Sequence, residues 1–543
     1  MVLYGILTRF IPSGGMSSRV AKSGAWVLSQ NAIGRALQLL MLLILARLIG
    51  PGEIGLVGIA LLTLSAMQKF TNIGLNTALI QRKEENVDSY LNTTWLLEIG
   101  RGLLILIVLV ASAPLIAWVF DTARAEHLVL AIAFSPLIVG LRNPGVVYFQ
   151  KNLSFHKQFT YRISGNIVQV VVAVGYALVW PTAWAYVVGF LAADVVRTLT
   201  SYLLHDFRPQ LSFDQGAARD LISYGKWITG SSILYFIYGE GDDAFVGWFL
   251  APAALGLYQY AYRFSNAPAT EISSVITSVM FPAYSKVQDD PNALRSSYLK
   301  TLQLISFISF PMAFGILAVT PTFVRAFLGS EWMGMILAMQ ILTIYGLLRA
   351  IGKTFGSVWK ATGRPDIITK LSALRVVLMA IFIYPATAAW GIEGTALVVT
   401  GIYLFPMMPL DLYIISRTVD VSISQLFNEF VYPLVASFVM AGGIWYVHSV
   451  TQISPVLEFF VLVAVGGAVL VAVALVSWAV GAAAAIVEYY DFRLVRSGDE
   501  LQYERGLLQR YDGSIPFEKI QTLTIAENPM KRYFGYATLY IET

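Results

Sequence analysis

The sequence predicts an all-α polytopic membrane protein of about fourteen transmembrane helices: two parallel six-helix lobes, two extra helices and a short β-rich cytoplasmic tail. Three observations predict this fold class. Apolar residues form 57% of the 543 residues and charged residues 13%, whereas soluble domains hold about 45–50% and about 25%. One pattern of residues recurs in the second half of the chain, and Lys and Arg residues gather in alternate loops.

The predicted spans are apolar segments of roughly the 20 residues that one bilayer crossing requires. Single Pro/Gly breaks, such as residues 50–52, separate several of them and suffice for a helical hairpin. The last segment is too long for one ordinary crossing. The segments are 24–49, 54–80, 90–118, 128–148, 163–180, 184–204, 227–250, 254–281, 298–319, 334–358, 367–385, 391–415, 428–448 and 455–487.

The recurring pattern is a helix–break–helix unit that appears twice, with a constant offset of 201 residues (256 − 55 = 201). Six spans separate the copies, so both halves should point the same way and be related by an axis along the membrane normal. We expect the transport path between the two lobes. The identical pairs are Gly24/Gly225, Trp26/Trp227, Pro51/Pro252, Gly55/Gly256, Leu56/Leu257 and Ala60/Ala261.

Positive charge follows every second predicted span, as with Arg82 and Lys83 after the second. By the positive-inside rule, the N-terminus and the tail are cytoplasmic, and the protein spans the cytoplasmic (inner) membrane. The predicted organisation is a cytoplasmic segment 1–23, an N-lobe 24–204, a cytoplasmic linker 205–226, a C-lobe 227–415, two further spans within 428–487, and the tail 488–543.

Several classes of function are disfavoured by residues that are missing. The chain has no Cys, and its four His residues show no metal-ligand spacing, so no disulfide, thiol chemistry or metal site is expected. Catalytic motifs are absent too, which favours a secondary transporter over an enzyme, with no cofactor and no nucleic-acid partner. Uphill transport would use a coupling ion, proton or sodium, or the gradient of the substrate itself.

Ionisable residues inside predicted spans are costly and indicate function. Arg35 and Gln38 in the first span lie three positions apart and share a helix face, as do Glu98 and Arg101 in the third. For Glu98 and Arg101, the alternative is an ion pair within one helix that only faces the bundle.

The seventh span carries three acids, Glu240, Asp242 and Asp243. In the repeat they align with apolar residues of the first span, whereas Arg35 aligns with an apolar residue of the seventh. This opposite polar content predicts an anion site in one lobe and a cation or proton site in the other. The alternative is that the glycines on either side of Glu240 break the helix and expose the acids to water.

Other polar and aromatic residues lie near the predicted membrane edges. Arg263, Arg349 and Lys353 either face a cavity or extend to the cytoplasmic edge, and for Lys353 the edge is favoured. Trp and Tyr residues near span ends are expected to anchor at the membrane interface. These are Trp180, Trp184, Tyr258 and Trp332.

An ordered set of short stretches carries a family resemblance. They are LARLIGPGEIGL at 45–56, Thr94 to Arg101, LRNPG at 141–145, LSF at 153–155, residues 242–247, LGLY at 255–258, Tyr262-Arg263 and ATGRP at 361–365. Over about residues 17–450 the chain resembles the polysaccharide exporters of the multidrug/oligosaccharidyl-lipid/polysaccharide flippase superfamily, in the colanic-acid/teichuronic-acid branch.

The resemblance implies a flippase that moves a polyprenyl-diphosphate-linked oligosaccharide to the outer leaflet by alternating access. The diphosphate and glycan would need a wet cationic cavity, since guanidinium groups suit phosphate oxygens, while the lipid tail stays in the bilayer. The expected substrate-binding residues, for diphosphate or glycan, are Arg35, Gln38, Arg101, Arg142 and Arg263. Those expected for ion or proton coupling are Glu98, Glu240, Asp242 and Asp243.

From about Tyr489 the pattern alternates as in strands. Residues 491–494, 501–508, 515–521 and 528–539 resemble part of the bacterial PH-like domain of YdbT-type membrane proteins. That family continues beyond the point that Thr543 reaches, so we expect an incomplete domain, joined by natural fusion or by a sequence artefact. The seam is expected between about His448 and Trp478, and the true start at Met1 or Met16.

Alternative functions stay open. A cation-coupled multidrug antiporter of the same superfamily would use the acids of the seventh span and need fewer arginines. A membrane polysaccharide polymerase would need a long external loop with catalytic residues, and a membrane scaffold would need no polar cavity. The expected partners are a lipid-linked oligosaccharide and membrane lipids, with the protein a monomer near the glycan polymerisation machinery.

Overall fold

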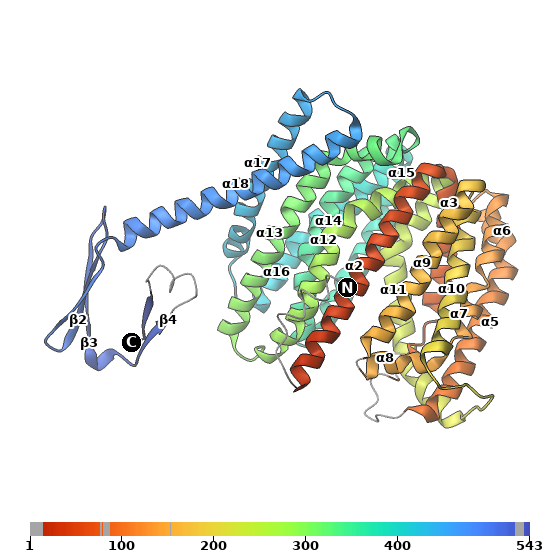
Figure 1. Ribbon diagram of the computed structural model, residues 1–543, viewed down its shortest axis with the longest axis horizontal. Coiled ribbons are helices and arrows are strands. Elements are labelled where there is room, and N and C mark those ends of the chain that lie inside the picture. Colours follow the sequence, from red (N-terminus) through yellow and green to blue (C-terminus); the bar gives the residue numbers. More distant parts are fainter. Residues whose placement is uncertain (1–14, 76–78, 80–86, 153, 527–536, 543) are drawn as a thin grey trace. The chain divides into compact units, whose positions relative to one another are not determined.

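The computed structural model consists mainly of long helices, with a few strands near the C-terminus (Figure 1). It describes residues 15–75, 79, 87–152, 154–526 and 537–542, of which 15–25, 28, 220–228, 231, 267–269, 538 and 542 are described by their backbone alone. The chain divides into two units, Met1–Ala464 and Val465–Thr543.

Helices of the first lobe follow one another through short breaks that contain Pro or Gly. Pro51 occupies the first turn of its helix, where its missing N–H costs no hydrogen bond. The fourth predicted span ends at Gly140 rather than at residue 148, and a separate turn begins at Pro144. The elements are α2 (Gly15–Leu48), α3 (Pro51–Phe70), α5 (Asp88–Val119), α6 (Ala123–Ile132), α7 (Ser135–Gly140), the 3₁₀ turn η1 (Pro144–Val146), α8 (Val147–Lys151), α9 (Phe155–Val179) and α10 (Trp184–Leu204).

The second lobe begins at Gln215, inside the range predicted as a linker, because the Asp214 carboxylate caps the helix by accepting the Ala217 N–H at 3.0 Å. This helix is continuous through Gly239 and Gly241, so the break considered for its acids is absent. The elements are α11 (Gln215–Leu250), α12 (Pro252–Lys286), α13 (Pro291–Phe323), the π turn η2 (Val324–Leu328), the 3₁₀ segment η3 (Ser330–Met335), α14 (Ile336–Ala361), α15 (Pro365–Ile402), the π turn η4 (Tyr403–Met407) and α16 (Met408–Thr418).

Two helices follow the second lobe, α17 (Ile423–Val450) and α18 (Pro455–Tyr489). The 35 residues of α18 extend about 52 Å at 1.5 Å per residue, against about 30 Å of hydrocarbon, in line with the predicted excess length. The tail forms an antiparallel sheet in the order β1-β2-β3 and an antiparallel pair β4-β5. The strands are β1 (Arg493–Ser497), β2 (Glu500–Arg505), β3 (Tyr511–Pro516), β4 (Thr522–Ala526) and β5 (Thr538–Glu542), with a 3₁₀ turn η5 (Phe517–Lys519).

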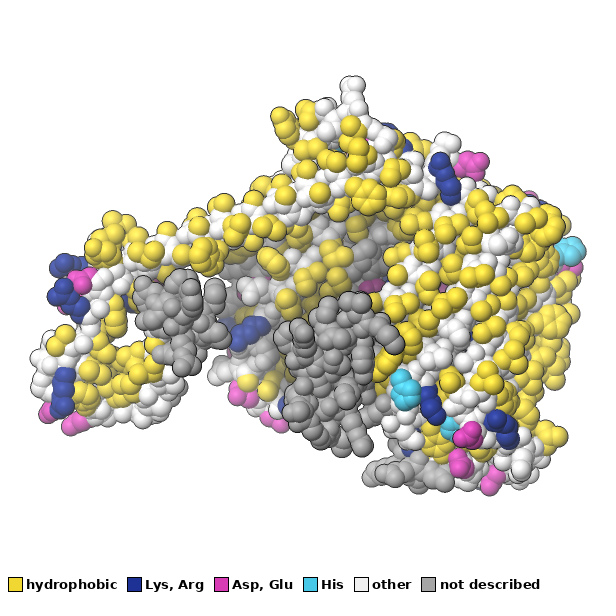
Figure 2. Space-filling model, viewed as in Figure 1, with side chains coloured by type: hydrophobic (Ala, Val, Ile, Leu, Met, Phe, Trp, Pro, Cys, Tyr) yellow, Lys and Arg dark blue, Asp and Glu magenta, His cyan; other side chains and the backbone are white. Residues whose placement is uncertain are grey.

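The all-α polytopic class is confirmed. Within the described residues, 11 helical stretches are long and apolar enough to cross a membrane. One of them, Pro365–Thr418, contains two predicted spans that meet at a kink at Trp390 and Gly391. The predicted seventh and eighth spans lie in α11 and α12, which are not among the 11. Hydrophobic side chains cover most of the visible helix surface, and many charged ones gather near helix ends (Figure 2).

The lobes meet where the repeated residues of α3 and α12 cross. A Cβ atom added at Gly55 would lie 1.6 Å from the Pro252 carbonyl oxygen, and one added at Gly256 would lie 2.1 Å from the Pro51 carbonyl oxygen. Only glycine lets the two backbones approach so closely. The repeat pairs Gly24/Gly225 and Trp26/Trp227 include side chains outside the described residues.

This glycine crossing, formed by Pro51, Gly55, Pro252 and Gly256, is reciprocal, as contacts about a two-fold axis are. Both helices begin at the crossing, and further along them a Cβ added at Gly58 would lie 2.6 Å from Gln259 Oε1, so the two helices run in the same direction and the axis runs along them. The predicted parallel arrangement of the two lobes is confirmed.

A buried asparagine organises one end of the first lobe. Asn143 Nδ2 donates to the carbonyl oxygens of His205 (3.2 Å) and Phe207 (2.7 Å), and its Oδ1 accepts the Gly145 N–H at 2.9 Å. Its own N–H donates to Ser201 Oγ at 2.9 Å. The LRNPG stretch is therefore a structural connection that ties the turn after α7 to the end of α10.

We expect His205, beside this connection, to make stability depend on pH. Its Nδ1 accepts the Phe207 N–H at 3.1 Å, which requires a neutral ring, and it stacks on Tyr148 with a centroid distance of 5.6 Å. Burial, helped by nearby Lys157, lowers the pKa of His205 below its ordinary value. Its contribution is therefore complete above about pH 6.5 and is lost as the pH falls through the folded pKa.

The measurement is the melting temperature of the purified protein in detergent between neutral and mildly acidic pH. The wild type should lose stability on acidification more than His205→Asn, because an amide oxygen can still accept the Phe207 N–H but does not titrate. Identical pH profiles for the two proteins would contradict the prediction.

Candidate functional site

Arg35 links the two lobes. Its Nη2 lies 2.5 Å from Glu271 Oε1 on α12, and its Nη1 donates to Gln38 Oε1 at 3.2 Å, as the spacing of three residues predicts. The Arg35 and Glu271 side chains are 53% and 48% exposed. Because an exposed pair contributes only about 0–1 kcal/mol, an anion could compete for the guanidinium at little cost.

Glu98, Arg101 and Arg142 come together at a cavity of about 270 Å³ in the first lobe, lined by α3, the segment 72–75, α5, α7 and Arg142. Arg101 pairs with Glu98 at 3.2 Å and donates to Gln68 O (2.9 Å) and Thr71 Oγ (3.1 Å). Its guanidinium is therefore held by the protein itself. Arg142 makes no hydrogen bond or ion pair with any described residue, so its charge is the one available to a ligand here.

The acids of α11 have different partners. Glu240 Oε1 lies 3.2 Å from Lys69 Nζ and accepts a hydrogen bond from Ser65 Oγ at 2.9 Å, both on α3 of the other lobe. Glu240 is thus neutralised by an interlobe ion pair. This contact makes it a less suitable coupling residue than the two aspartates that follow it.

Asp242 is buried and accepts a hydrogen bond from the Tyr258 hydroxyl at 2.7 Å, whereas the partly buried Asp243 accepts one from Gln259 Nε2 at 3.4 Å. Neither carboxylate has a Lys or Arg nitrogen within 4 Å in the described part of the chain. Adjacent carboxylates without a cationic partner inside a helix bundle are suited to bind a proton or a cation. Arg263, on α12, likewise makes no ion pair or hydrogen bond with a described residue.

The prediction of interfacial anchors is wrong for Tyr258 and Trp332. Both side chains are fully buried, since Tyr258 binds Asp242 and the Trp332 indole N–H donates to Ala46 O at 2.9 Å across the lobe boundary. Trp180, by contrast, is 60% exposed. An aromatic residue near a span end can therefore serve as an internal contact rather than a membrane anchor.

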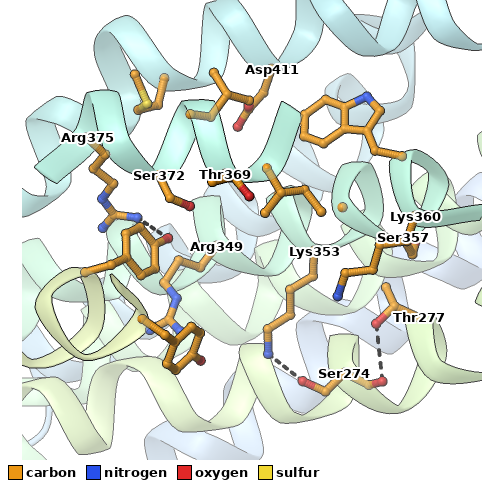
Figure 3. A pocket seen from close by; sticks show the side chains of 18 of the residues that line it. Ser274, Thr277, Arg349, Lys353, Ser357, Lys360, Thr369, Ser372, Arg375 and Asp411 are labelled. Atoms are coloured by element: carbon orange, nitrogen blue, oxygen red, sulfur yellow. Dashed lines mark hydrogen bonds between the residues drawn. The ribbon is translucent and has the colours of Figure 1, made fainter. Parts of the chain in front are cut away.

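A larger cavity of about 730 Å³ lies inside the second lobe, lined by residues of α11, α12, α14, α15, η4 and α16 (Figure 3). We call it the C-lobe cavity. Its charged lining residues are Arg349, Lys353, Lys360, Arg375 and Asp411. Lys353 was expected to extend to the membrane edge. Instead, it donates to Ser274 Oγ at 2.5 Å and to a backbone carbonyl oxygen of α12.

Sequence reasoning missed several of these residues. Arg375, Asp411 and Glu271 each lie in a predicted span (367–385, 391–415 and 254–281), so the rule applied to Arg35 would have found them. It also missed Asp194 and Arg197, which pair at 3.1 Å in the sixth span with the same spacing as Glu98 and Arg101.

Comparison with known proteins places these residues in a family context. Residues 44–337, more than half of the chain, match the family described as "Polysaccharide biosynthesis protein", and residues 452–543 match "Bacterial PH domain". The chain is 29% identical over 359 residues to "Lipopolysaccharide biosynthesis protein WzxC" of Escherichia coli (strain K12), covering 66% of this chain and 73% of that protein.

A second relative and one solved structure extend the similarity. The chain is 23% identical over 378 residues to "Teichuronic acid biosynthesis protein TuaB" of Bacillus subtilis (strain 168), covering 68% of this chain and 76% of that protein. Its fold is similar to a structure described as "Lipid II flippase MurJ, inward closed conformation", with a TM-score of 0.65 and 14% identity, over 83% of this chain and 98% of that one. At this identity the likeness concerns the fold.

Proposed function

The chain belongs to the polysaccharide biosynthesis protein family, and we propose that it is a flippase for a polyprenyl-diphosphate-linked oligosaccharide. The names of its relatives support a glycan substrate, and the fold that it shares with a lipid II flippase supports a lipid carrier. The single observation that carries the proposal is Arg35. It is an exposed cation between two lobes, and its only acidic partner in the described residues belongs to the opposite lobe.

In this mechanism, the Arg35–Glu271 pair separates when a diphosphate takes the place of the carboxylate. A diphosphate offers the guanidinium more oxygen acceptors than one carboxylate does. The lipid tail stays in the bilayer while the glycan passes between the lobes. With the N-terminus cytoplasmic, as the positive-inside rule predicts, the glycine crossing lies at the outer side of the inner membrane and closes that side.

The experiment reconstitutes the full chain in liposomes and follows a polyprenyl-diphosphate oligosaccharide carrying a lectin-accessible sugar. We expect the lipid to move to the leaflet that the lectin can reach, while the bilayer stays impermeable to the lectin. Absence of movement under both proton and sodium gradients would overturn the proposal. Efflux of ethidium in place of the glycan lipid would instead support the multidrug antiporter.

We place ion or proton coupling at Asp242 and Asp243, whereas Glu98 and Glu240 are held in ion pairs. Asp242→Asn keeps an acceptor for the Tyr258 hydroxyl but cannot bind a proton or pair with a cation. We expect this variant to fold, to lose the response of flipping to an imposed gradient, and to be at least about tenfold slower, the loss expected when one charged hydrogen-bonding site is removed.

The matched control is Asp366→Asn, which removes a carboxylate of the same size from an exposed pair with Lys370. Its flipping rate and gradient response should equal those of the wild type. A gradient response that survives in Asp242→Asn, measured in the same liposomes, would contradict the assignment.

A further inference from the structure

The C-lobe cavity carries more positive charge than the protein neutralises. Four cations line it, Arg349, Lys353, Lys360 and Arg375, against one carboxylate, Asp411. In the part of the chain that the structure describes, no carboxylate oxygen lies within 4 Å of a charged nitrogen of any of the four. Three of them, Arg349, Lys353 and Arg375, are buried or partly buried, whereas Lys360 is exposed in the last turn of α14. Charges held inside a helix bundle are ordinarily paired, so these three unpaired cations point to an anionic occupant.

Arg375 shows most clearly that the excess is built into the fold. Its side chain is 5% exposed, and its guanidinium carbon lies 4.4, 5.0 and 4.8 Å from the rings of Tyr238, Tyr345 and Tyr403. It donates to the hydroxyl groups of Tyr238 and Tyr345, which use two of its five N–H groups. These three tyrosines come from α11, α14 and η4, and they orient the cation without cancelling its charge.

Arg349 and Lys353 are held in a similar way by neutral groups. Arg349 donates to the Tyr262 hydroxyl, and Lys353 donates to Ser274 Oγ at 2.5 Å and to the Thr270 carbonyl oxygen at 2.6 Å. Figure 3 shows Arg349, Lys353 and Arg375 among the residues that line the cavity, with the amino group of Lys353 directed toward Ser274. Three cations on two helices, α14 and α15, thus line one cavity while their hydrogen-bond partners remain uncharged.

The rest of the lining suits a carbohydrate. Hydroxyl groups, which both donate and accept hydrogen bonds as sugar hydroxyls do, line the walls between the cations. They belong to Ser274, Thr277, Ser278, Ser357, Thr369 and Ser372. Tyr235, Tyr238 and Trp359 add aromatic faces, and the volume of about 730 Å³ falls within the range of about 300–1,000 Å³ for small-ligand sites.

We propose that the C-lobe cavity binds an acidic sugar unit of the transported glycan, with Arg375, Arg349 and Lys353 facing its carboxylate. The inference rests on the proposed flippase function and adds the charge of the cargo. A sugar carboxylate suits the cavity better than the diphosphate, since the cavity lies within one lobe, whereas the lipid-attached diphosphate must pass between the lobes, beside Arg35.

The test compares two lipids in the same liposomes, both with a polyprenyl diphosphate, one ending in glucuronate and the other in glucose. Arg375→Gln should slow movement of the acidic lipid at least about tenfold, the loss expected for one charge-assisted hydrogen bond, and leave the neutral lipid within about twofold of the wild type. Lys353→Gln, which leaves the tyrosine cage intact, should shift the selectivity in the same direction.

The matched control is Lys370→Gln on the same helix, an exposed cation paired with Asp366 at 3.0 Å, which should leave the ratio of the two rates unchanged. An equal loss of rate for both lipids in Arg375→Gln would assign the cavity to the diphosphate and overturn the acidic-sugar proposal. Unchanged rates for both lipids would also overturn it. Failure of the wild type to move either lipid would overturn the flippase function instead. Calorimetry in detergent then tests binding by the cavity independently of transport. Methyl glucuronide should bind the wild type but not Arg375→Gln, and methyl glucoside should bind neither protein.

Discussion

Replacing Gly55 or Gly256 with alanine is expected to force the lobes apart and abolish transport. In a free helix, Gly→Ala stabilises by about 1 kcal/mol. At these positions the sign should reverse, because the new methyl group would lie 1.6 or 2.1 Å from a backbone carbonyl oxygen of the opposite lobe. Since neither helix can yield by a side-chain rotation, we expect a loss of about 3 kcal/mol for the closed arrangement.

Gly52 provides the matched control, since it lies in the first turn of the same helix as Gly55 and an added Cβ meets nothing within 4 Å. Gly52→Ala should keep or slightly raise the melting temperature and preserve flipping. Because the chain has no Cys, a cysteine pair at residues 50 and 331 reports separation of the lobes by cross-linking without background, since a Cβ added at Gly50 would lie 2.5 Å from Glu331 Oε2 in the other lobe. Full flipping and unchanged cross-linking in Gly55→Ala would refute a role for the crossing.

Removal of the Arg35 charge is expected to abolish flipping at almost no cost in stability. The pair with Glu271 is half-exposed on both sides, so Arg35→Ala should lower the free energy of unfolding by at most about 1 kcal/mol. Transport should fall below detection, since the guanidinium is the proposed diphosphate contact between the lobes. The measurements are thermal unfolding in detergent and lectin access in liposomes.

Charge reversal distinguishes substrate binding from a latch. In Arg35→Glu with Glu271→Arg, the ion pair forms again, but the cation moves from α2 to α12. If Arg35 only latches the lobes, this double variant should transport as the wild type does. We expect it to stay inactive, and restored transport would remove Arg35 from the substrate site.

The parts of the site that depend on a single helix were predictable from the sequence. Glu98 and Arg101 pair because residues three apart share a helix face, and Arg35 and Gln38 bond for the same reason. The parallel lobes were also predictable, since the offset of 201 residues and an even number of spans determine the relation of the halves.

What could not be predicted depends on contacts between helices that are distant in sequence. The surroundings of Arg375 come from three elements, so its position in an apolar segment gives no sign of the tyrosines around it. Tyr258 was wrongly predicted to be an interfacial anchor, because a position near a span end carries no information about its hydrogen-bond partner Asp242 across the helical hairpin. Lys353 lies in the C-lobe cavity because its Nζ finds hydrogen-bond acceptors on α12, which local sequence does not reveal.

The reciprocity of the crossing bears on how the two halves of this protein could diverge. Gly55 meets the backbone of the second half and Gly256 meets that of the first, so each half is part of the environment that constrains the other. A larger side chain that one half alone could accommodate would still clash with the backbone of the other half, so the two glycine positions are constrained together. Pro51, Gly55 and Ala60 recur as Pro252, Gly256 and Ala261, whereas the polar residues proposed for substrate and ion binding, such as Arg35 and Asp242, lie outside this mutual constraint and align with apolar residues of the other lobe.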